Sequence, residues 1–408
     1  MYTAKNRLSL IAAAILIANT GPVAAKTDQS ASGELGCSNR VATMDKNFVA
    51  GAYSKCESVG ARSFRLTIAP EDEGEINCSP WYAFRLSPKS EAPLVIDLNY
   101  TRCGHRYWPK ISTDGKTWER MPQGAVTVED DGEQLSAKIT LELGSQPVFI
   151  AAQELVPPAA YRAWLDALQD APFATRFLLG KSAEGRDIEA LTLADPASQQ
   201  RETVVLVGRQ HPPEVTGALA MFPFVETLMG DSDLAIAYRA RFETVIVPLL
   251  NPDGVVRGHW RHNTGGIDLN RDWGPFSQPE TQLMNAVLQS IASSPDRRLR
   301  LLIDFHSTRR DIFYTIPDEL PTDPPLFTKN WLAFYQERMP GYEVTRDARH
   351  TAGRPISKAH TFDAYGAPGI TFEIGDETDR ILIKRIGRES AIAMMYTLLE
   401  TPISNPPR

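Results

Sequence analysis

From residue 203 onward, short apolar runs alternate with amphipathic segments, and this alternation restricts the fold more than any other feature of the chain. The apolar runs cover residues 203–208, 244–250, 299–305 and 369–374. Residues 215–229, 278–291, 328–338 and 381–399 have the spacing of helices. Strands that alternate with helices predict a mixed, mostly parallel sheet flanked by helices. We therefore expect an α/β fold for this part of the chain.

The part before it has a different pattern. Residues 62–69, 81–86, 93–100 and 134–143 are rich in β-branched and aromatic side chains, and Gly, Asp and Pro clusters separate them. This pattern predicts a small all-β sandwich. Residues 26 to about 60 are polar and show no clear period. Pro157 and Pro158 precede a predicted helix at 159–169, so we expect a β-sandwich domain at 26–155 and an α/β domain at 156–402.

The N-terminus has the pattern of a secretory signal. Lys5 and Arg7 precede an apolar run at 8–18 that is too short to span a bilayer, and small residues at 23–25 form a cleavage site. We expect residues 1–25 to be removed and the protein to be exported, to the periplasm or the medium. No later stretch is long and apolar enough to predict a transmembrane anchor.

The four cysteines, Cys37, Cys56, Cys78 and Cys103, all lie in the predicted β-sandwich. An even number of cysteines after an export signal predicts two disulfide bonds, and the spacing leaves all three pairings open. The alternative is a structural zinc site, but the chain has no Cys-x-x-Cys pair.

Charge narrows the range of partners. The chain of 408 residues has a net charge of −7, with 42% hydrophobic and 23% charged residues. These fractions are ordinary for a globular protein. An acidic chain without a basic tract argues against nucleic acid or an anionic membrane as the partner.

Three residues after apolar runs form a candidate metal site. His211 and Glu214 follow the first run, and His306 follows the third. Sites in α/β sheets form at the carboxyl ends of strands. Two imidazoles and one carboxylate are a standard ligand set for catalytic zinc, which leaves a coordination position open for water. We predict one zinc ion per chain, with Asp304 on the same strand face as His306 and able to accept its second N–H.

Four further residues are candidates for the chemistry. Glu373 lies within an apolar run, where burial suits a carboxylate for work as a general base. Arg261, Asn270 and Arg271 lie between the two ligand segments. An arginine and an amide suit recognition of a carboxylate, and a second arginine suits stabilisation of an oxyanion.

The order of the motifs carries a family resemblance. His-x-x-Glu, Asn-Pro-Asp-Gly, Trp-Arg, Asp-Leu-Asn-Arg, Asp-Phe-His and Thr-Phe-Glu follow one another between about residues 159 and 401. Together they resemble the zinc carboxypeptidase (carboxypeptidase A-like) family. WYAFR at 81–85 and YWPKISTDGKTW at 107–118 resemble the N-terminal domain of its cytosolic carboxypeptidase (Nna-like) branch.

The resemblance implies a fold, an activity and residue roles. The fold would be that of the zinc carboxypeptidases, and the activity would be hydrolysis of the C-terminal residue of peptides or proteins, with peptidoglycan stem peptides as one substrate of an exported enzyme. The roles would be zinc binding by His211, Glu214 and His306, base catalysis by Glu373, polarisation of the scissile carbonyl by Arg261, and binding of the terminal carboxylate by Asn270 and Arg271.

One other enzyme class shares part of this pattern. Zinc-dependent N-acyl amino acid deacylases of the aspartoacylase and succinylglutamate desuccinylase type also have His-x-x-Glu and a late histidine. The Asn-Pro-Asp-Gly segment and the β-rich part argue against that class.

The chain departs from the family pattern at two places. Pancreatic-type members carry an arginine two residues after the first ligand histidine, where this chain has Pro213. The mobile active-site tyrosine of the family has no clear counterpart. Tyr365 is the tyrosine nearest before Glu373, and its spacing is too short, so that role stays unassigned.

Overall fold

The computed structural model describes residues 36–74, 76–130, 135–198 and 201–402. Residues 35–408 group into one compact unit. The predicted signal at 1–25 lies outside the described residues. The domain boundary expected near residue 155 stays a prediction, because that unit includes both sides of it.

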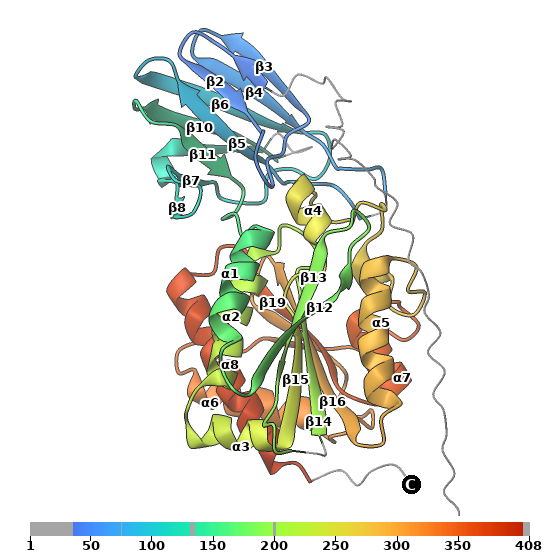
Figure 1. Ribbon diagram of the computed structural model, residues 1–408. Coiled ribbons are helices and arrows are strands. Elements are labelled where there is room, and N and C mark those ends of the chain that lie inside the picture. Colours follow the sequence, from blue (N-terminus) through green and yellow to red (C-terminus); the bar gives the residue numbers. More distant parts are fainter. Residues whose placement is uncertain (1–35, 75, 131–134, 199–200, 403–408) are drawn as a thin grey trace, which may run out of the picture. The chain divides into compact units, whose positions relative to one another are not determined.

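Two antiparallel-rich sheets form the N-terminal, β-rich region (Figure 1). The first has the strand order β1 (Gly36–Ser38), β2 (Ala42–Asp45), β5 (Ala83–Pro88), β11 (Val148–Ala151), β7 (Lys110–Ser112) and β8 (Glu119–Arg120). The second has the order β3 (Lys55–Gly60), β4 (Ser63–Ile68), β6 (Ala92–Tyr100), β10 (Leu135–Leu143) and β9 (Val126–Asp130). A short 3₁₀ turn, η1 (Gln123–Ala125), precedes β9.

One hydrophobic core lies between these two sheets. Alternate residues along the strands are fully buried, as for Phe64 and Leu66 on β4 and Leu94 and Ile96 on β6, and they share a cluster with Phe84 on β5. Side chains of period two that meet from two sheets are the mark of a β-sandwich. The prediction of an all-β N-terminal region is confirmed.

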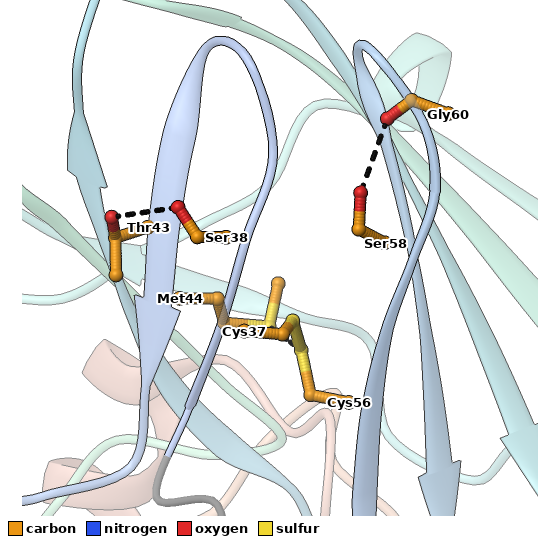
Figure 2. The surroundings of a disulfide bond; sticks show 7 residues. All are labelled: Cys37, Ser38, Thr43, Met44, Cys56, Ser58 and Gly60. Carbon is orange, nitrogen blue, oxygen red and sulfur yellow. Dashed lines mark hydrogen bonds between the residues drawn. A yellow bond between two sulfur atoms is a disulfide. The ribbon is translucent and has the colours of Figure 1, made fainter.

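Two disulfide bonds join parts of the β-rich region. Cys37 on β1 is bonded to Cys56 on β3, with the Cα atoms 5.7 Å apart, and Cys78 is bonded to Cys103 at 5.2 Å. Because β1 and β3 belong to different sheets, the first bond ties the two sheets together (Figure 2). The Sδ atom of Met44 lies 3.6 Å from the Cys56 sulfur. The structure selects one of the three pairings that the sequence left open.

An eight-stranded sheet forms the centre of the α/β region. Its order is β12 (Ala174–Lys181), β13 (Asp187–Leu193), β15 (Phe242–Val247), β14 (Arg201–Gly208), β16 (Arg297–Thr308), β19 (Gly369–Gly375), β17 (Ile312–Thr315) and β18 (Arg346–Ala348). The four central strands β15, β14, β16 and β19 are parallel, and antiparallel pairs occur toward both edges. The predicted mixed, mostly parallel sheet is confirmed.

Helices cover both faces of this sheet (Figure 1). One face packs against α2 (Val215–Met229), α3 (Asp233–Arg241), α6 (Phe327–Arg338) and α8 (Arg380–Glu400). The other packs against α5 (Pro279–Ala292) and α7 (Ser357–Tyr365). The remaining helices are α1 (Pro158–Leu168), α4 (Pro252–Arg257) and the 3₁₀ turn η2 (Leu269–Arg271). Ile303 and Phe305 face the first layer and Leu302 faces the second, so strand alternation places Asp304 and His306 on the α5 side.

Some elements escaped the sequence-based expectations. Strands β1, β2 and β3 lie in the stretch expected to lack a pattern, and α7 was not expected at all. These strands have three to six residues, too few to show a period, so pairing with neighbouring strands stabilises them. No helix in the described ranges is long and apolar enough to cross a membrane.

Candidate metal centre and active site

The segment after β14 and the carboxyl-terminal end of β16 bring the three predicted ligands together. His211 lies three residues beyond β14, Glu214 directly precedes α2, and His306 lies near the end of β16. The Glu214 carboxylate contacts both imidazoles, with Oε1 2.8 Å from His211 Nδ1 and Oε2 2.6 Å from His306 Nδ1. All three residues are buried, and their candidate ligand atoms lie within 4.8 Å of one another.

A small residue allows this approach. Gly217, in the first turn of α2, lies against the backbone of β16, and a Cβ atom there would be 2.5 Å from the carbonyl oxygen of His306. Any larger side chain would push α2 away from the strand. Gly217 therefore sets the distance between Glu214 at the start of α2 and His306 on β16.

The second nitrogen of each histidine is held by a carboxylate. His211 Nε2 lies 2.9 Å from Asp268 Oδ1, and His306 Nε2 lies 2.8 Å from Asp304 Oδ2. These contacts favour the tautomer with hydrogen on Nε2, so both Nδ1 lone pairs face the Glu214 oxygens. Lone pairs facing a carboxylate need a cation or protons between them.

The donor set fits zinc. Burial opposes ionisation of Glu214, but the neighbouring His211 and His306 outweigh it and hold the pKa of Glu214 far below its usual range. Two imidazoles and an ionised carboxylate, each oriented by a further contact, are the donors that zinc takes in catalytic sites.

The loop that carries His211 is held from several sides. Arg209 has a left-handed backbone conformation, with φ of 52°, and is buried. Its guanidinium donates to the Tyr161 hydroxyl at 3.1 Å and to the Pro212 carbonyl at 2.5 Å. The next residue, Gln210, donates to Asp304 Oδ2 at 2.5 Å. This network links the His211 loop to the carboxylate that orients His306.

Glu373 lies directly beside His306, because the two residues pair in the register of β19 and β16. Its Oε2 atom is buried and has no hydrogen-bond partner among the described residues, while part of the side chain reaches solvent. Burial and the nearby Glu214 carboxylate raise the pKa of Glu373 to about 7. A carboxylate with this pKa next to a metal site can accept a proton from water at neutral pH.

Asp268 joins the metal site to a predicted arginine. Its Oδ1 contacts His211 Nε2, and its Oδ2 accepts hydrogen bonds from Arg261 at 2.8 Å (Nε) and 2.7 Å (a terminal nitrogen). Asp268 was not among the site residues predicted from the sequence. The rule that a ligand histidine donates its second N–H to a carboxylate pointed to an acidic residue, and Asp268 stands two positions before Asn270.

Asn270 and Arg271 lie on η2, next to the metal site. Asn270 Nδ2 is 3.3 Å from His306 Nε2, and its Oδ1 accepts from the Ser357 backbone N–H at 2.9 Å. Arg271 donates to the Asn270 carbonyl at 2.6 Å. Burial lowers the pKa of Arg271, and the neighbouring cations Arg261 and Arg354 add to that effect. The Asp268 carboxylate opposes this lowering and balances part of the positive charge, so the surroundings of Arg271 suit an anion only in part.

The two departures from the family pattern have structural counterparts. Pro213 contributes its carbonyl oxygen to a turn that starts α2, accepting from the Val215 N–H at 2.8 Å. Tyr365 lies near the end of α7 and accepts from Gln289 at 3.4 Å, on the face covered by α5. Tyr314 on β17 is the tyrosine that shares a sheet face with Glu373, since it pairs with Thr371 two positions away. Sequence distance from Glu373 hid Tyr314 from the sequence-based reasoning.

The fold and the site together define an α/β protein with a buried His, Glu, His cluster, a candidate metal centre, at the ends of parallel strands. Residues 161–372 match the family described as Zinc carboxypeptidase, and residues 44–152 match the Cytosolic carboxypeptidase N-terminal domain. The first match covers more than half of the chain, and the chain belongs to the zinc carboxypeptidase family. The resemblance stated from the motifs is confirmed for both parts.

Similar curated proteins are cytosolic carboxypeptidases. Cytosolic carboxypeptidase 6 of Mus musculus is 24% identical over 65% of this chain and 53% of its own length. The protein of the same name in Caenorhabditis elegans is 30% identical over 64% of this chain and 61% of its own length. The chain thus spans somewhat more than half of these relatives.

Solved structures show the same fold. A metallo-carboxypeptidase from Burkholderia cenocepacia has a TM-score of 0.75 at 21% identity, with 88% of this chain and 99% of that one covered. A metallo-carboxypeptidase from Pseudomonas aeruginosa, in complex with (2-guanidinoethylmercapto)succinic acid, has a TM-score of 0.68 at 20% identity, with 88% and 99% covered.

Proposed function

We propose that this protein is a zinc-dependent metallocarboxypeptidase that removes the C-terminal residue of peptides or proteins. The observation that carries the proposal is the convergence of the Glu214 carboxylate and two imidazole Nδ1 atoms beside Glu373. His211, Glu214 and His306 would hold the zinc ion, which supplies Lewis-acid activation of a water molecule and of the scissile carbonyl.

The residues around the proposed metal site would carry out proton transfer and stabilise the developing charge. Glu373 accepts a proton from the attacking water and passes it to the leaving amine, for which a pKa near 7 is suited. Arg261 reaches the site through Asp268 and stabilises the negative charge that develops on the carbonyl oxygen. Because Arg261 is already held in place, it needs little rearrangement as that charge appears.

Recognition of a free carboxylate would restrict cleavage to the chain end. Arg271 lies within electrostatic range of two other cations, Arg261 and Arg354; Asp268 balances part of this positive charge, and a bound carboxylate would balance more of it. Asn270 lies beside His306 and so places this anion site next to the metal ligands. The anion site is the feature that favours an exopeptidase over an endopeptidase.

The substrate source follows from the expected location. Two disulfide bonds in the β-rich region support an oxidising compartment and hence export. We propose exported peptides as substrates, and peptidoglycan stem peptides as a specific class to test among them. The curated relatives are named for carboxypeptidase activity, which supports the reaction but not a particular terminal residue.

A peptide pool with free and amidated C-termini tests the proposal. We expect mass spectrometry to show loss of single C-terminal residues from the free peptides alone, abolished by a chelator and restored by zinc. Cleavage of the amidated peptides would contradict exopeptidase action. Release of the acyl acid from N-acyl amino acids, without peptide cleavage, would support the deacylase alternative.

A further inference from the structure

A loop of the β-rich region reaches the backbone that carries Arg261. This loop follows β4, and Glu71 lies three residues after the end of that strand. The Glu71 carboxylate accepts three consecutive backbone hydrogen bonds. Oε2 accepts from Trp260 at 3.1 Å, and Oε1 accepts from Arg261 at 2.8 Å and from His262 at 2.9 Å. Three successive N–H groups directed at one carboxylate fix the course of that backbone.

The residues on either side of Arg261 make further contacts with the same region. His262 Nδ1 lies 2.8 Å from Asp72 Oδ2, and the Trp260 indole N–H donates to the Tyr107 hydroxyl at 3.0 Å. Asp72 is itself held by the Gly74 N–H at 2.9 Å. The β-rich region therefore contacts the side chains of Trp260 and His262 and accepts hydrogen bonds from the backbone amides of residues 260–262.

The α/β region holds the two ends of this segment, because the His259 N–H donates to the Gly254 carbonyl at 2.9 Å and the Asn263 N–H donates to the Ile267 carbonyl at 3.0 Å. Residues 259–263 belong to neither a helix nor a strand. Among the described residues, the Glu71 carboxylate accepts from the amides of 260, 261 and 262. Buried backbone N–H groups without a partner are costly, so removal of the Glu71 carboxylate would favour another path for this segment.

The position of this backbone determines where the Arg261 guanidinium lies in the site. This guanidinium donates a hydrogen bond to Asp268, the carboxylate that also contacts His211. A hydrogen-bond donor stabilises a transition state only when it already lies where the charge will develop. A shift of the 260–262 backbone would move the guanidinium while leaving His211 and Glu214 on the segment between β14 and α2 and His306 on β16.

We propose that Glu71 is a positioning residue for Arg261, so that the β-rich region sets the geometry of the carbonyl-polarising arm. The inference rests on the proposed function, because it takes the role of Arg261 in peptide hydrolysis from there. Glu71 does not touch the metal ligands, and its effect passes through the backbone of residues 260–262. Its loss therefore lowers kcat, while the three proposed metal ligands keep their own supports and zinc stays bound.

The test compares Glu71→Gln with Glu73→Gln, an exposed glutamate two residues away. Glutamine keeps one oxygen acceptor and turns an amide N–H toward a backbone donor. We expect kcat to fall about 10- to 100-fold, as for a small displacement of a catalytic group, with KM and bound zinc unchanged. Glu73→Gln should match the wild type, and Glu71→Asp, which keeps the charge on a shorter chain, should lie between.

A double-mutant cycle with Arg261→Ala separates positioning from general loss of structure. If Glu71 acts through Arg261, Glu71→Gln lowers kcat in the wild type but has no further effect in the Arg261→Ala protein. Equal losses in both backgrounds would overturn the proposal. So would unchanged kcat in Glu71→Gln, or loss of bound zinc in that variant.

A measurement without substrate distinguishes this proposal from the proposed function. Hydrogen exchange in the full chain should be faster at the amides of 260–262 in Glu71→Gln than in the wild type, and unchanged in Glu73→Gln. Unchanged exchange would overturn the positioning role even in an active enzyme. A wild type without peptidase activity would refute the proposed function and, with it, the catalytic consequence of positioning Arg261. Faster exchange in Glu71→Gln would still show, in that case, that Glu71 holds the backbone of residues 260–262.

Discussion

The two parts of this molecule use buried charge in different ways. In the α/β region, charged and imidazole groups gather at the carboxyl ends of the central strands, where Glu214, Asp304 and His306 are all buried. In the β-rich region the core between the two sheets is apolar. Its acidic residues Glu71 and Asp72 instead lie on a loop that contacts the α/β region. The comparison teaches that the reacting groups and the framework that orients them can lie in different parts of one chain.

The β-rich region also contacts a second segment of the site, the end of the strand that carries Glu373. Asp376 lies just past β19, the strand of Glu373, and pairs with Arg106 at 2.7 Å. The next residue, Glu377, accepts from Lys110 at 3.0 Å, and Gln153 donates to the Asp376 carbonyl at 3.0 Å. Both the Arg261 segment and the end of the Glu373 strand are therefore held by the β-rich region.

The largest expected effect is at the proposed base. Glu373→Gln should lower kcat by about 1000-fold, within the range for loss of a general base, because an amide cannot accept the proton from water. Metal analysis should show the same zinc content as the wild type. Glu319→Gln, at an exposed glutamate of the same region, is the control. Near-normal turnover by Glu373→Gln would show that the chemistry of the α/β region lies elsewhere.

The carboxylates behind the two histidines should have unequal effects. Asp268→Asn and Asp304→Asn should each weaken zinc binding by about 10- to 100-fold, which is typical for partners of ligand histidines. At saturating zinc, only Asp268→Asn should also lower kcat strongly, because Asp268 alone of the pair holds Arg261. Competition with a chromophoric chelator and steady-state kinetics measure the two effects. Equal kcat in both variants would remove the proposed link between the metal and Arg261.

The disulfide between the two sheets should affect stability without affecting the chemistry. Replacement of Cys37 and Cys56 by serine opens a crosslink between residues 19 apart in sequence. Loss of that constraint should lower the free energy of unfolding by about 3 kcal/mol, measured by denaturant titration, while kcat per bound zinc stays the same. A fall in kcat would mean that the β-rich region influences the site more widely than through the loop at Glu71.

The smallest expected effect is a pH dependence of stability in the β-rich region. Burial lowers the pKa of His105 to about 4, from about 6.5 in the unfolded chain. The unfolded state therefore binds more protons between these values, and stability is lost as the pH falls from 6.5 through 4, by about 2 kcal/mol at pH 5. His105→Gln should flatten the pH profile of the unfolding free energy in this window. Identical profiles would show that His105 does not titrate on unfolding.

The sequence predicted the central sheet and the grouping of the candidate site, for identifiable reasons. The apolar runs before His211 and His306 are buried on both faces, so they have a strong and continuous signal. The carboxyl ends of parallel strands lie at one edge of the sheet, so the sequence alone predicted that these residues lie close together. Tyr314 and Asp268 could not be found in that way, because their neighbours are set by strand pairing and by a loop.

The contact of Glu71 with the Arg261 segment was still harder to predict from the sequence. It lies 189 to 191 residues from the amides that it accepts from, and an acidic residue in a loop is normally a solvated one. Strands β1, β2 and β3 were missed for a related reason, since each is defined by its partner strand rather than by its own composition. What the sequence does not show in this protein is mainly contact between distant segments.

The double contact of Asp268 makes two binding events interdependent. One carboxylate is shared between His211, a proposed zinc ligand, and Arg261, a proposed substrate contact. A ligand that draws Arg261 away from Asp268 changes the charge that Asp268 presents to His211, and with it the affinity for zinc. By thermodynamic reciprocity, zinc must change the affinity for that ligand by the same factor. If the proposed roles hold, metal affinity in this family member is a property of the liganded state as well as of the three proposed ligands.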